Sequence, residues 1–203
     1  KQYHEVKVLK NFTKYPTQQM LYGTQVHSAL EDYVGKKTPL PKNYEQFAKQ
    51  LDPLVEMEGI KYPEHRMAVT YDKKPCTFGA KDYWVRGIAD LLIIDDDGLK
   101  ARVVDYKTGN NKYPDREQLK LMALMVFAHF PHIRKVNAAL LFVVKNDMVK
   151  ASFTLDDAEP AWWDYRERIA RIEQAHATGV WNPKPSPLCP WCPVTTCENH
   201  PRS

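Results

Sequence analysis

Two apolar segments joined by one acidic turn constrain the fold of this chain more than any other feature. Residues 83–94 and residues 99–107 are rich in valine, isoleucine, leucine and alanine, and Asp95-Asp96-Asp97-Gly98 separates them. An Asp-Gly turn between two apolar runs is a strong signal for a β-hairpin. The sequence therefore predicts that these two segments form paired antiparallel strands.

The remaining segments predict helices around a small sheet. Apolar residues recur at helical spacing in residues 17–34, in residues 44–57 with an interruption or bend near Pro53, in residues 115–129, and from Asp156 or Asp157 to about Ala177. Strand-like segments cover residues 65–71, 136–144 and 148–155. This order predicts a mixed α/β (α+β) fold whose central mixed sheet is flanked by helices.

Composition narrows the class of protein without naming a function. Hydrophobic residues make up 43% of the chain and charged residues 27%, which is typical of a globular domain. The sequence has no apolar run of about 18 residues and no leader-like segment, so we expect a cytoplasmic protein without a membrane span. A net charge of +4 is compatible with a polyanionic partner but does not require one.

Acidic residues in the hairpin strands are the first candidate functional residues. Asp90 lies among glycine and apolar residues, where a carboxylate is costly unless it is paired or bound to a cation. Asp105 and Lys107 end the next strand and, two residues apart, share one face of it. The hairpin therefore predicts two carboxylates and an ammonium group at one edge of the sheet.

Two interpretations of this grouping remain open on the residues alone. Carboxylate oxygens are hard ligands for Mg²⁺ or Mn²⁺, and a lysine beside such an ion suits phosphodiester hydrolysis. The alternative is a buried Asp-Lys ion pair with a structural role only. Asp105 and Lys107 by themselves do not separate the two.

The ordered motifs resemble those of the PD-(D/E)XK nuclease superfamily, and within it the RecB-like exonucleases and the related nucleases of CRISPR adaptation. The matching segments are Gly23-Thr24-Gln25-Val26-His27, Gly87-Ile88-Ala89-Asp90, Asp105-Tyr106-Lys107-Thr108-Gly109, and Gln118. One departure is Met122, where these nucleases often carry a tyrosine. The resemblance implies that the protein is a DNA nuclease.

The resemblance also implies a role for each matching residue. Asp90 and Asp105 would be metal ligands, the main-chain carbonyl of Tyr106 a further ligand, and His27 a ligand that favours Mn²⁺. Lys107 would be the catalytic lysine, and Gln118 would order the site or contact DNA. Glu64 is a candidate outer ligand, although a solvated strand residue is the simpler interpretation.

The implied reaction is hydrolysis of DNA, linear or single-stranded, by an exonuclease that uses Mg²⁺ or Mn²⁺. A structure-specific endonuclease would use the same residues. Another class of protein is also an alternative: a DNA-binding or assembly module with a degenerate, inactive nuclease core. Such a module would be expected to lack Asp90, Asp105 or Lys107, but all three are present. An interaction domain centred on the cysteine-rich tail is a further alternative.

Three cysteines in a proline-rich tail predict a second metal site. Cys189 and Cys192 are separated by two residues, and Cys197 follows after four more. Such a thiolate trio favours Zn²⁺ or an iron-sulfur cluster. The fourth ligand is His200, Cys76 or a cysteine just before Lys1. RecB-like nucleases with a 4Fe-4S cluster join three C-terminal cysteines to one cysteine before the first helix, so the resemblance implies the last of these.

The two sites together suggest a domain organisation. We expect a nuclease domain over residues 1–180, with its PD-(D/E)XK core at about residues 17–155. Residues 181–203 would form a metal-binding tail packed on the same domain, in which the cluster ties the two ends of the chain together as a structural staple.

Overall fold

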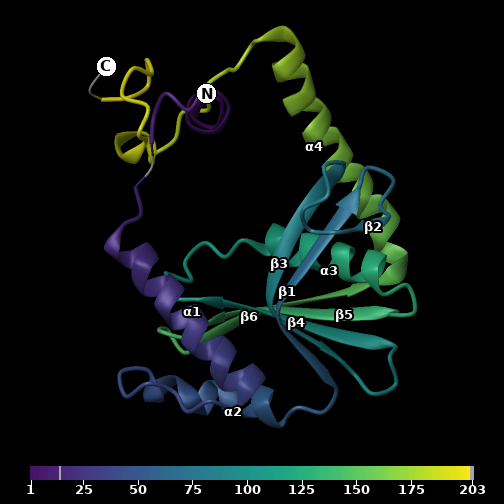
Figure 1. The fold of residues 1–203 in the computed structure, drawn as a ribbon. Coiled ribbons are helices and arrows are strands. Elements are labelled where there is room, and N and C mark those ends of the chain that lie inside the picture. Colours follow the sequence, from purple (N-terminus) through teal and green to yellow (C-terminus); the bar gives the residue numbers. More distant parts are fainter. Residues whose placement is uncertain (14, 202–203) are drawn as a thin grey trace. The chain divides into compact units, whose positions relative to one another are not determined.

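The computed structural model describes residues 1–13 and 15–201, which form two compact units. One unit comprises residues 19–163, and the other comprises residues 1–13 and 15–18 with residues 164–201. The helices and strands longer than five residues are α1 (Gln18–Lys36), α2 (Ala48–Glu56), β1 (Ile60–Thr70), β3 (Tyr83–Ile94), β4 (Lys100–Lys107), α3 (Arg116–His129), β5 (Lys135–Phe142), β6 (Asp147–Thr154) and α4 (Ala158–Thr178), as Figure 1 shows.

The larger unit is built on a six-stranded sheet in the order β2-β1-β3-β4-β5-β6, where β2 is the short strand Pro75–Cys76. The pair β4 and β5 is parallel and every other pair is antiparallel, so the sheet is mixed. The predicted fold class is confirmed.

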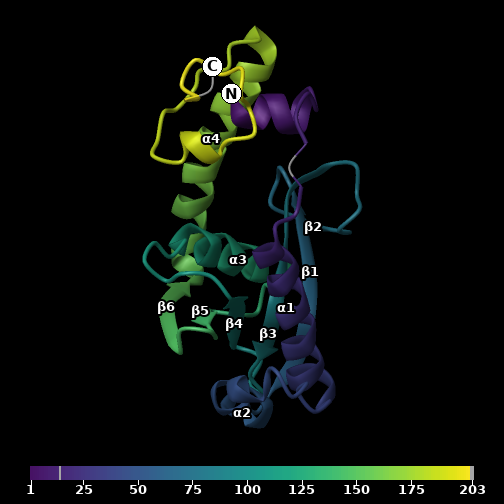
Figure 2. The ribbon, with the colours of Figure 1, turned by 90° about the vertical axis from the view of Figure 1, so that its left-hand side faces the viewer.

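Helices cover both faces of this sheet (Figures 1 and 2). One face carries α1 and α2, whose buried side chains form a core cluster with residues of β3, β4 and β5, among them Leu91, Val104 and Leu141. The other face carries α3, where Met122 and Met125 lie against Gly87 of β3. Burial of two apolar faces by helices is what stabilises a sheet of this kind.

The acidic hairpin forms as the sequence predicted. Strand β3 ends at Ile94 and β4 begins at Lys100, with the Gly98 amide donating to the Asp95 carbonyl at 2.8 Å. Gly98 has φ +68, a left-handed conformation that glycine adopts without strain. An ion pair between Arg102 and Asp95 closes the turn.

Two sequence expectations need correction. Helix α2 is not interrupted at Pro53. The buried side chains of Leu51 and Leu54 hold it on the core, although proline cannot donate a backbone hydrogen bond. The break comes earlier, where a 3₁₀ turn over Glu45–Phe47 precedes α2. Strand β1 begins at Ile60 rather than residue 65, since Pro63 interrupts the sequence pattern but still pairs with Leu91.

The smaller unit joins the two ends of the chain. A short helix over His4–Val8 precedes α1, and Lys1 forms a 2.7 Å ion pair with Glu198. The Trp181 ring stacks on His4 at a centroid distance of 4.8 Å. The N-terminal segment and the cysteine-rich tail therefore pack on each other within this unit.

None of the helices among the described residues has the length and apolar character needed to cross a membrane.

Candidate active site

The site lies where β3 and β4 separate. Their ladder of paired residues runs from Ile94 opposite Ala101 to Leu91 opposite Val104 and ends there. The next step would place Asp90 directly opposite Asp105, but like charges in that position repel each other. Strand β4 continues alone beside β5 as far as Lys107, opposite Phe142. We call this opening, formed by Asp90 on β3 and residues 105–107 on β4, the fork.

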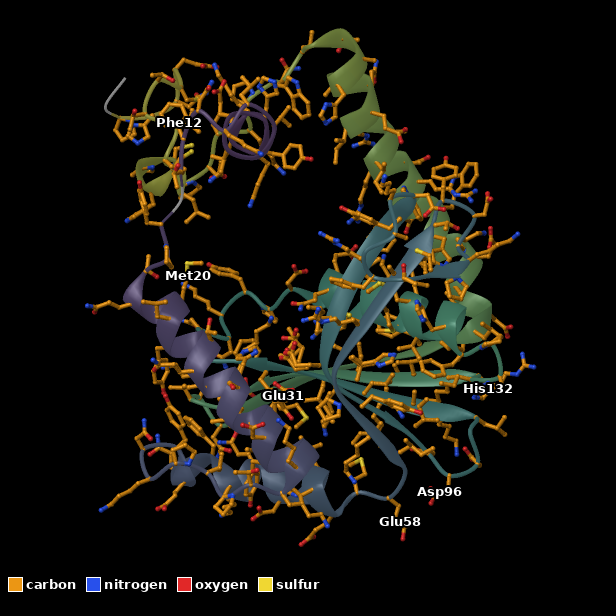
Figure 3. The ribbon with its side chains drawn as sticks, viewed as in Figure 1. Phe12, Met20, Glu31, Glu58, Asp96 and His132 are labelled. Carbon is orange, nitrogen blue, oxygen red and sulfur yellow. The ribbon has the colours of Figure 1, made fainter. Side chains whose placement is uncertain are left out.

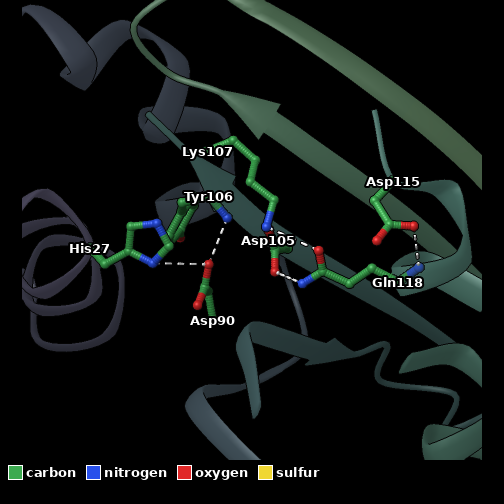
Figure 4. A network of polar contacts seen from close by, with 7 residues as sticks. All are labelled: His27, Asp90, Asp105, Tyr106, Lys107, Asp115 and Gln118. Carbon is green, nitrogen blue, oxygen red and sulfur yellow. Dashed lines mark hydrogen bonds and ion pairs between the residues drawn. The ribbon is translucent and has the colours of Figure 1, made fainter. Parts of the chain in front are cut away.

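Asp90 links the two strands at the fork by a side-chain hydrogen bond instead of a backbone hydrogen bond. Its Oδ2 accepts a hydrogen bond from the Tyr106 amide at 2.6 Å (Figure 4). The N–H and C=O groups of one strand residue point to the same side of the strand. The Tyr106 carbonyl is therefore directed toward the fork as well. The Lys107 carbonyl instead accepts from the amide of Val143, the residue after β5, at 3.1 Å.

Three polar side chains form one linked group on the α3 side of the fork (Figure 4). Lys107 Nζ donates to Gln118 Oε1 at 3.0 Å, and Gln118 Nε2 donates to Asp105 Oδ1. Lys107 Nζ also lies 2.6 Å from Asp105 Oδ2, as an ion pair without hydrogen-bond geometry. Gln118 thus fixes the positions of both the carboxylate and the ammonium group.

The position of Gln118 is set by the start of α3. Asp115 is the N-cap residue, and its Oδ1 accepts from the amides of Glu117 at 3.1 Å and Gln118 at 3.3 Å. Leu119 is fully buried, which anchors the first turn on the sheet. The capping residue of α3 therefore also orients a side chain of the site.

His27 approaches the fork from the opposite layer, on α1. Its Nδ1 lies 3.3 Å from Asp90 Oδ2, and this contact raises the pKa of the imidazole above its usual value, although burial opposes the rise. The His27 ring also meets Tyr106 edge-on at a centroid distance of 6.1 Å. Residues of both helical layers can reach the same point because the strands are apart there.

The electrostatics of the fork favour a bound cation. Asp105 is only 5% exposed, and burial, followed by the negative charge of Asp90, raises the pKa of its carboxyl group while Lys107 opposes the rise. Among the described residues, the buried Asp105 Oδ2 has the Lys107 ammonium group, 2.6 Å away, as its only polar partner. A divalent ion would relieve the repulsion between the two carboxylates.

The donor groups at the fork fit a divalent ion, although side chains alone do not complete a cage. Within residues 1–13 and 15–201, no three His, Cys, Asp or Glu side chains gather closely enough to hold a metal by themselves. Two carboxylates, the Tyr106 carbonyl and His27 make a mixed set in which oxygen ligands predominate. Mg²⁺ and Mn²⁺ prefer such sets and keep several water molecules.

The glycine of the Gly23-to-His27 segment allows α1 to come close to the end of β4. A Cβ atom at Gly23 would lie 3.2 Å from Oγ1 of Thr108, the residue after Lys107. His27 follows four residues later on the same side of the helix. The distance between Gly23 and Thr108 therefore controls how far His27 reaches into the fork.

We expect Gly23→Val to lower the rate of DNA cleavage, the activity that the motif resemblance implies, at least tenfold. The branched side chain would push α1 away from Thr108 and move His27 away from Asp90. Gly23→Ala, whose single methyl group needs a shift of only a few tenths of an ångström, should lose less. Initial rates with Mn²⁺ measure the effect, and circular dichroism checks the fold. Equal activity of both variants and the wild type would show that the approach at Gly23 does not position His27.

The backbone conformation of Glu64, which also lies in this region, could not be predicted from the sequence. Glu64 lies on β1 between the paired residues Pro63 and His65, at the level of Asp90, with a left-handed φ of +46. It is half-buried, and burial followed by the charge of Asp90 raises the pKa of its carboxyl group. No local sequence signal marks a glutamate with positive φ in a strand.

A pocket of about 540 Å³ lies beside His27, between α1 and Glu64. Met20 and Glu31, both labelled in Figure 3, come from the helical wall of this pocket. Glu31 follows His27 by four residues and so shares its face of α1, a spacing that could have been read from the sequence. The pocket opens the His27 side of the fork to molecules from solution.

Met122 belongs to the core rather than to a binding surface. It is 7% exposed, and its Cε would lie 3.0 Å from a Cβ atom at Gly87. The face of α3 one turn after Gln118 therefore offers no exposed aromatic side chain. The departure from the tyrosine expected at this position is explained by packing against Gly87.

The fork brings together polar groups from both helical layers, with two carboxylates at the same level of neighbouring strands. The sequence profile of the PD-(D/E)XK nuclease superfamily matches residues 2–197, and the chain belongs to that superfamily. Members of it generally hydrolyse phosphodiester bonds with divalent metal ions. The superfamily indicated by the motifs is confirmed, and the RecB-like branch stays a prediction.

The crystal structure of SSO0001 is 15% identical to this chain, with a TM-score of 0.43, over 90% of this chain and 71% of that one. No curated protein sequence matches the chain.

Proposed function

We propose that this protein is a deoxyribonuclease that requires Mg²⁺ or Mn²⁺ and acts as an exonuclease on DNA ends or single strands. The observation that carries the nuclease activity is the convergence of Asp90, Asp105 and Lys107 at the fork. The preference for ends is supported by the RecB-like order of the motifs.

Asp90, Asp105, the Tyr106 carbonyl and His27 would hold the divalent ion. Bound there, the ion would withdraw charge from the scissile phosphate and make a water molecule a stronger acid. His27 adds a nitrogen ligand, which favours Mn²⁺ over Mg²⁺ because imidazole suits the softer ion. The contact with Asp90 orients the imidazole ring before any ion arrives.

Lys107 is the residue that would act on the phosphate and the attacking water. Its ammonium group has three N–H donors, and one of them donates to Gln118. A donor that faces neither Gln118 nor Asp105 can orient the nucleophile or balance the charge that grows on the phosphate during the reaction. Gln118 acts through Lys107 and Asp105, as a positioning residue.

The mode of cleavage can be tested with one sequence in three forms. We expect linear duplex and linear single-stranded DNA to be degraded with Mn²⁺ or Mg²⁺, while a covalently closed circle of the same sequence stays intact. Asp90→Asn should degrade none of them. Rapid cutting of the closed circle would identify an endonuclease, and no metal-dependent cleavage of any form would contradict the nuclease proposal itself.

We also propose that Cys189, Cys192 and Cys197 bind a 4Fe-4S cluster or Zn²⁺. The three thiols line one cavity of about 520 Å³ that Lys1 also lines, and the Lys1 side chain pairs with Glu198 beside Cys197. A cysteine directly before Lys1 would be attached to a residue that lines this cavity, which is compatible with its being the fourth ligand. Within the tail itself, the buried His200 is the other candidate for the fourth ligand.

Metal analysis tests the tail without reference to cleavage. We expect anaerobically prepared protein that includes the segment before Lys1 to contain iron and to absorb visible light, and Cys192→Ser to lose both. His200→Ala should keep the iron if the upstream residue is the ligand. Zinc at about one equivalent, lost in His200→Ala, would identify a Cys₃His zinc site instead.

A further inference from the structure

The segment Thr108–Asp115, here called the site loop, connects two parts of the fork and presents one aromatic side chain to solvent. It begins directly after Lys107 and ends at the N-cap of α3, three residues before Gln118. Tyr113 is 83% exposed, more than any other large hydrophobic or aromatic residue in the described part of the chain. Tyr106, by contrast, is 1% exposed and belongs to the core.

The site loop is held in place on both sides of Tyr113. Asn111 Nδ2 donates to Asp147 Oδ2 at 2.6 Å, which ties the loop to the start of β6. Before it, the Lys112 amide donates to Asn110 Oδ1 at 2.8 Å, and after it Asp115 caps α3. The backbone on either side of Tyr113 is therefore restrained, and Pro114 restricts it further.

A cation accompanies the exposed ring. Lys112 Nζ lies 5.3 Å from the centroid of the Tyr113 ring, and Arg116 is exposed on the first turn of α3. Of the acids nearby, Asp115 is engaged as the helix cap and Asp147 by Asn111, whose hydrogen bond lowers the pKa of that carboxyl group. The site loop thus offers one aromatic face together with basic groups that remain free to meet phosphate.

An aromatic side chain next to basic groups is the combination that binds single-stranded nucleic acid, since any unpaired base can stack on the ring while the cations follow the backbone. Bases within a duplex are stacked on each other and have no free face. Tyr113 is the sixth residue after Lys107, which limits the distance between their Cα atoms to about 20 Å. A strand held at the fork therefore reaches Tyr113 within a few nucleotides.

Resting on the proposed nuclease function, we propose that Tyr113 stacks on an unpaired base and Lys112 contacts the adjoining phosphate, so that the enzyme takes single-stranded or frayed DNA at its fork. The site loop is then a specificity element: it distinguishes an unpaired strand from a duplex by the availability of a base face.

Binding by an inactive enzyme tests this interaction separately from cleavage. In an Asp105→Asn background, we expect Tyr113→Ala to weaken binding of a fluorescent 12-nucleotide single strand roughly five- to hundredfold, the range for one lost base stack. Tyr113→Phe should bind like the parent. Trp163→Ala, which removes another exposed aromatic of the same unit, should have no effect. Binding of a blunt duplex should change less than twofold in every variant.

Lys112→Gln gives an independent measurement of the phosphate contact. It should reduce the slope of log affinity against log salt concentration for the single strand by about 0.7, the value for one phosphate. Unchanged single-strand binding by Tyr113→Ala, or a loss that Tyr113→Phe does not restore, would overturn the proposal. A different result would contradict the nuclease function: a wild-type protein that cleaves no DNA with Mn²⁺ or Mg²⁺. Single-strand binding that depends on Tyr113 could still be observed in that case.

Discussion

Lys107→Ala is expected to lower the rate of metal-dependent DNA cleavage by about 10²–10⁴, the range found when a group that transfers or orients a proton in the transition state is removed. Lys107 lies 2.6 Å from Asp105 Oδ2 and donates to Gln118, so its ammonium group is held at the fork and not free to rotate into solvent. The loss should appear in kcat, with KM changed little, because the group acts on the reacting phosphate.

Two further variants separate a catalytic role from a structural ion pair. Lys107→Arg keeps the charge but cannot place a compact ammonium group against both partners, so it should recover only a small part of the rate. Lys120→Ala removes a lysine of α3 that pairs with Glu117 instead, and it should cleave at the wild-type rate. If Lys107→Ala cleaves normally, the pair with Asp105 is structural and the assignment of the fork is wrong.

The sequence predicted the hairpin and the face that Asp105 and Lys107 share because both depend on short-range geometry. An Asp-Gly turn fixes which strands pair, and a period of two fixes which side chains are neighbours. The Leu91-to-Val104 pairing then places Asp90 at the level of Asp105. These placements needed no knowledge of the rest of the fold.

Contacts between segments that are distant in the sequence could not be predicted from the residue patterns without the motif resemblance. Nothing in residues 17–34 shows that His27 meets Asp90, since that contact depends on how closely α1 packs at Gly23. The left-handed backbone of Glu64 and the burial of Met122 against Gly87 likewise depend on tertiary packing. The burial of Tyr106 and the exposure of Tyr113 likewise depend on the folded structure.

Asp105 is expected to cost stability when no metal is bound. Its carboxyl pKa is raised in the folded protein by burial first and by Asp90 next, so the folded chain binds that proton more tightly than the unfolded chain does. The stability that this group contributes is therefore present at low pH and is lost as the pH rises through the folded pKa. At neutral pH the charged carboxylate destabilises the protein until a cation neutralises it.

Asp105→Asn should consequently melt at or above the wild-type temperature in EDTA at pH 7.5 and yet be inactive. Mn²⁺ at about 100 times its Kd should stabilise the wild type by about 2.7 kcal/mol. For a protein of this size, such a gain raises Tm by roughly 5–10 °C. The variant, which lacks one of the two carboxylate ligands, should show less than a quarter of that shift in differential scanning calorimetry.

The matched control is Asp97→Asn, in the exposed turn between β3 and β4, where the side chain accepts from the Leu99 amide and an asparagine oxygen can do the same. It removes one negative charge far from the ladder's open end and should keep the full Mn²⁺ shift. The two carboxylates at the fork make opposite contributions with and without metal, since the repulsion that destabilises the empty fork is what attracts the ion. An equal Mn²⁺ shift in Asp105→Asn and wild type would place the ion elsewhere in the protein.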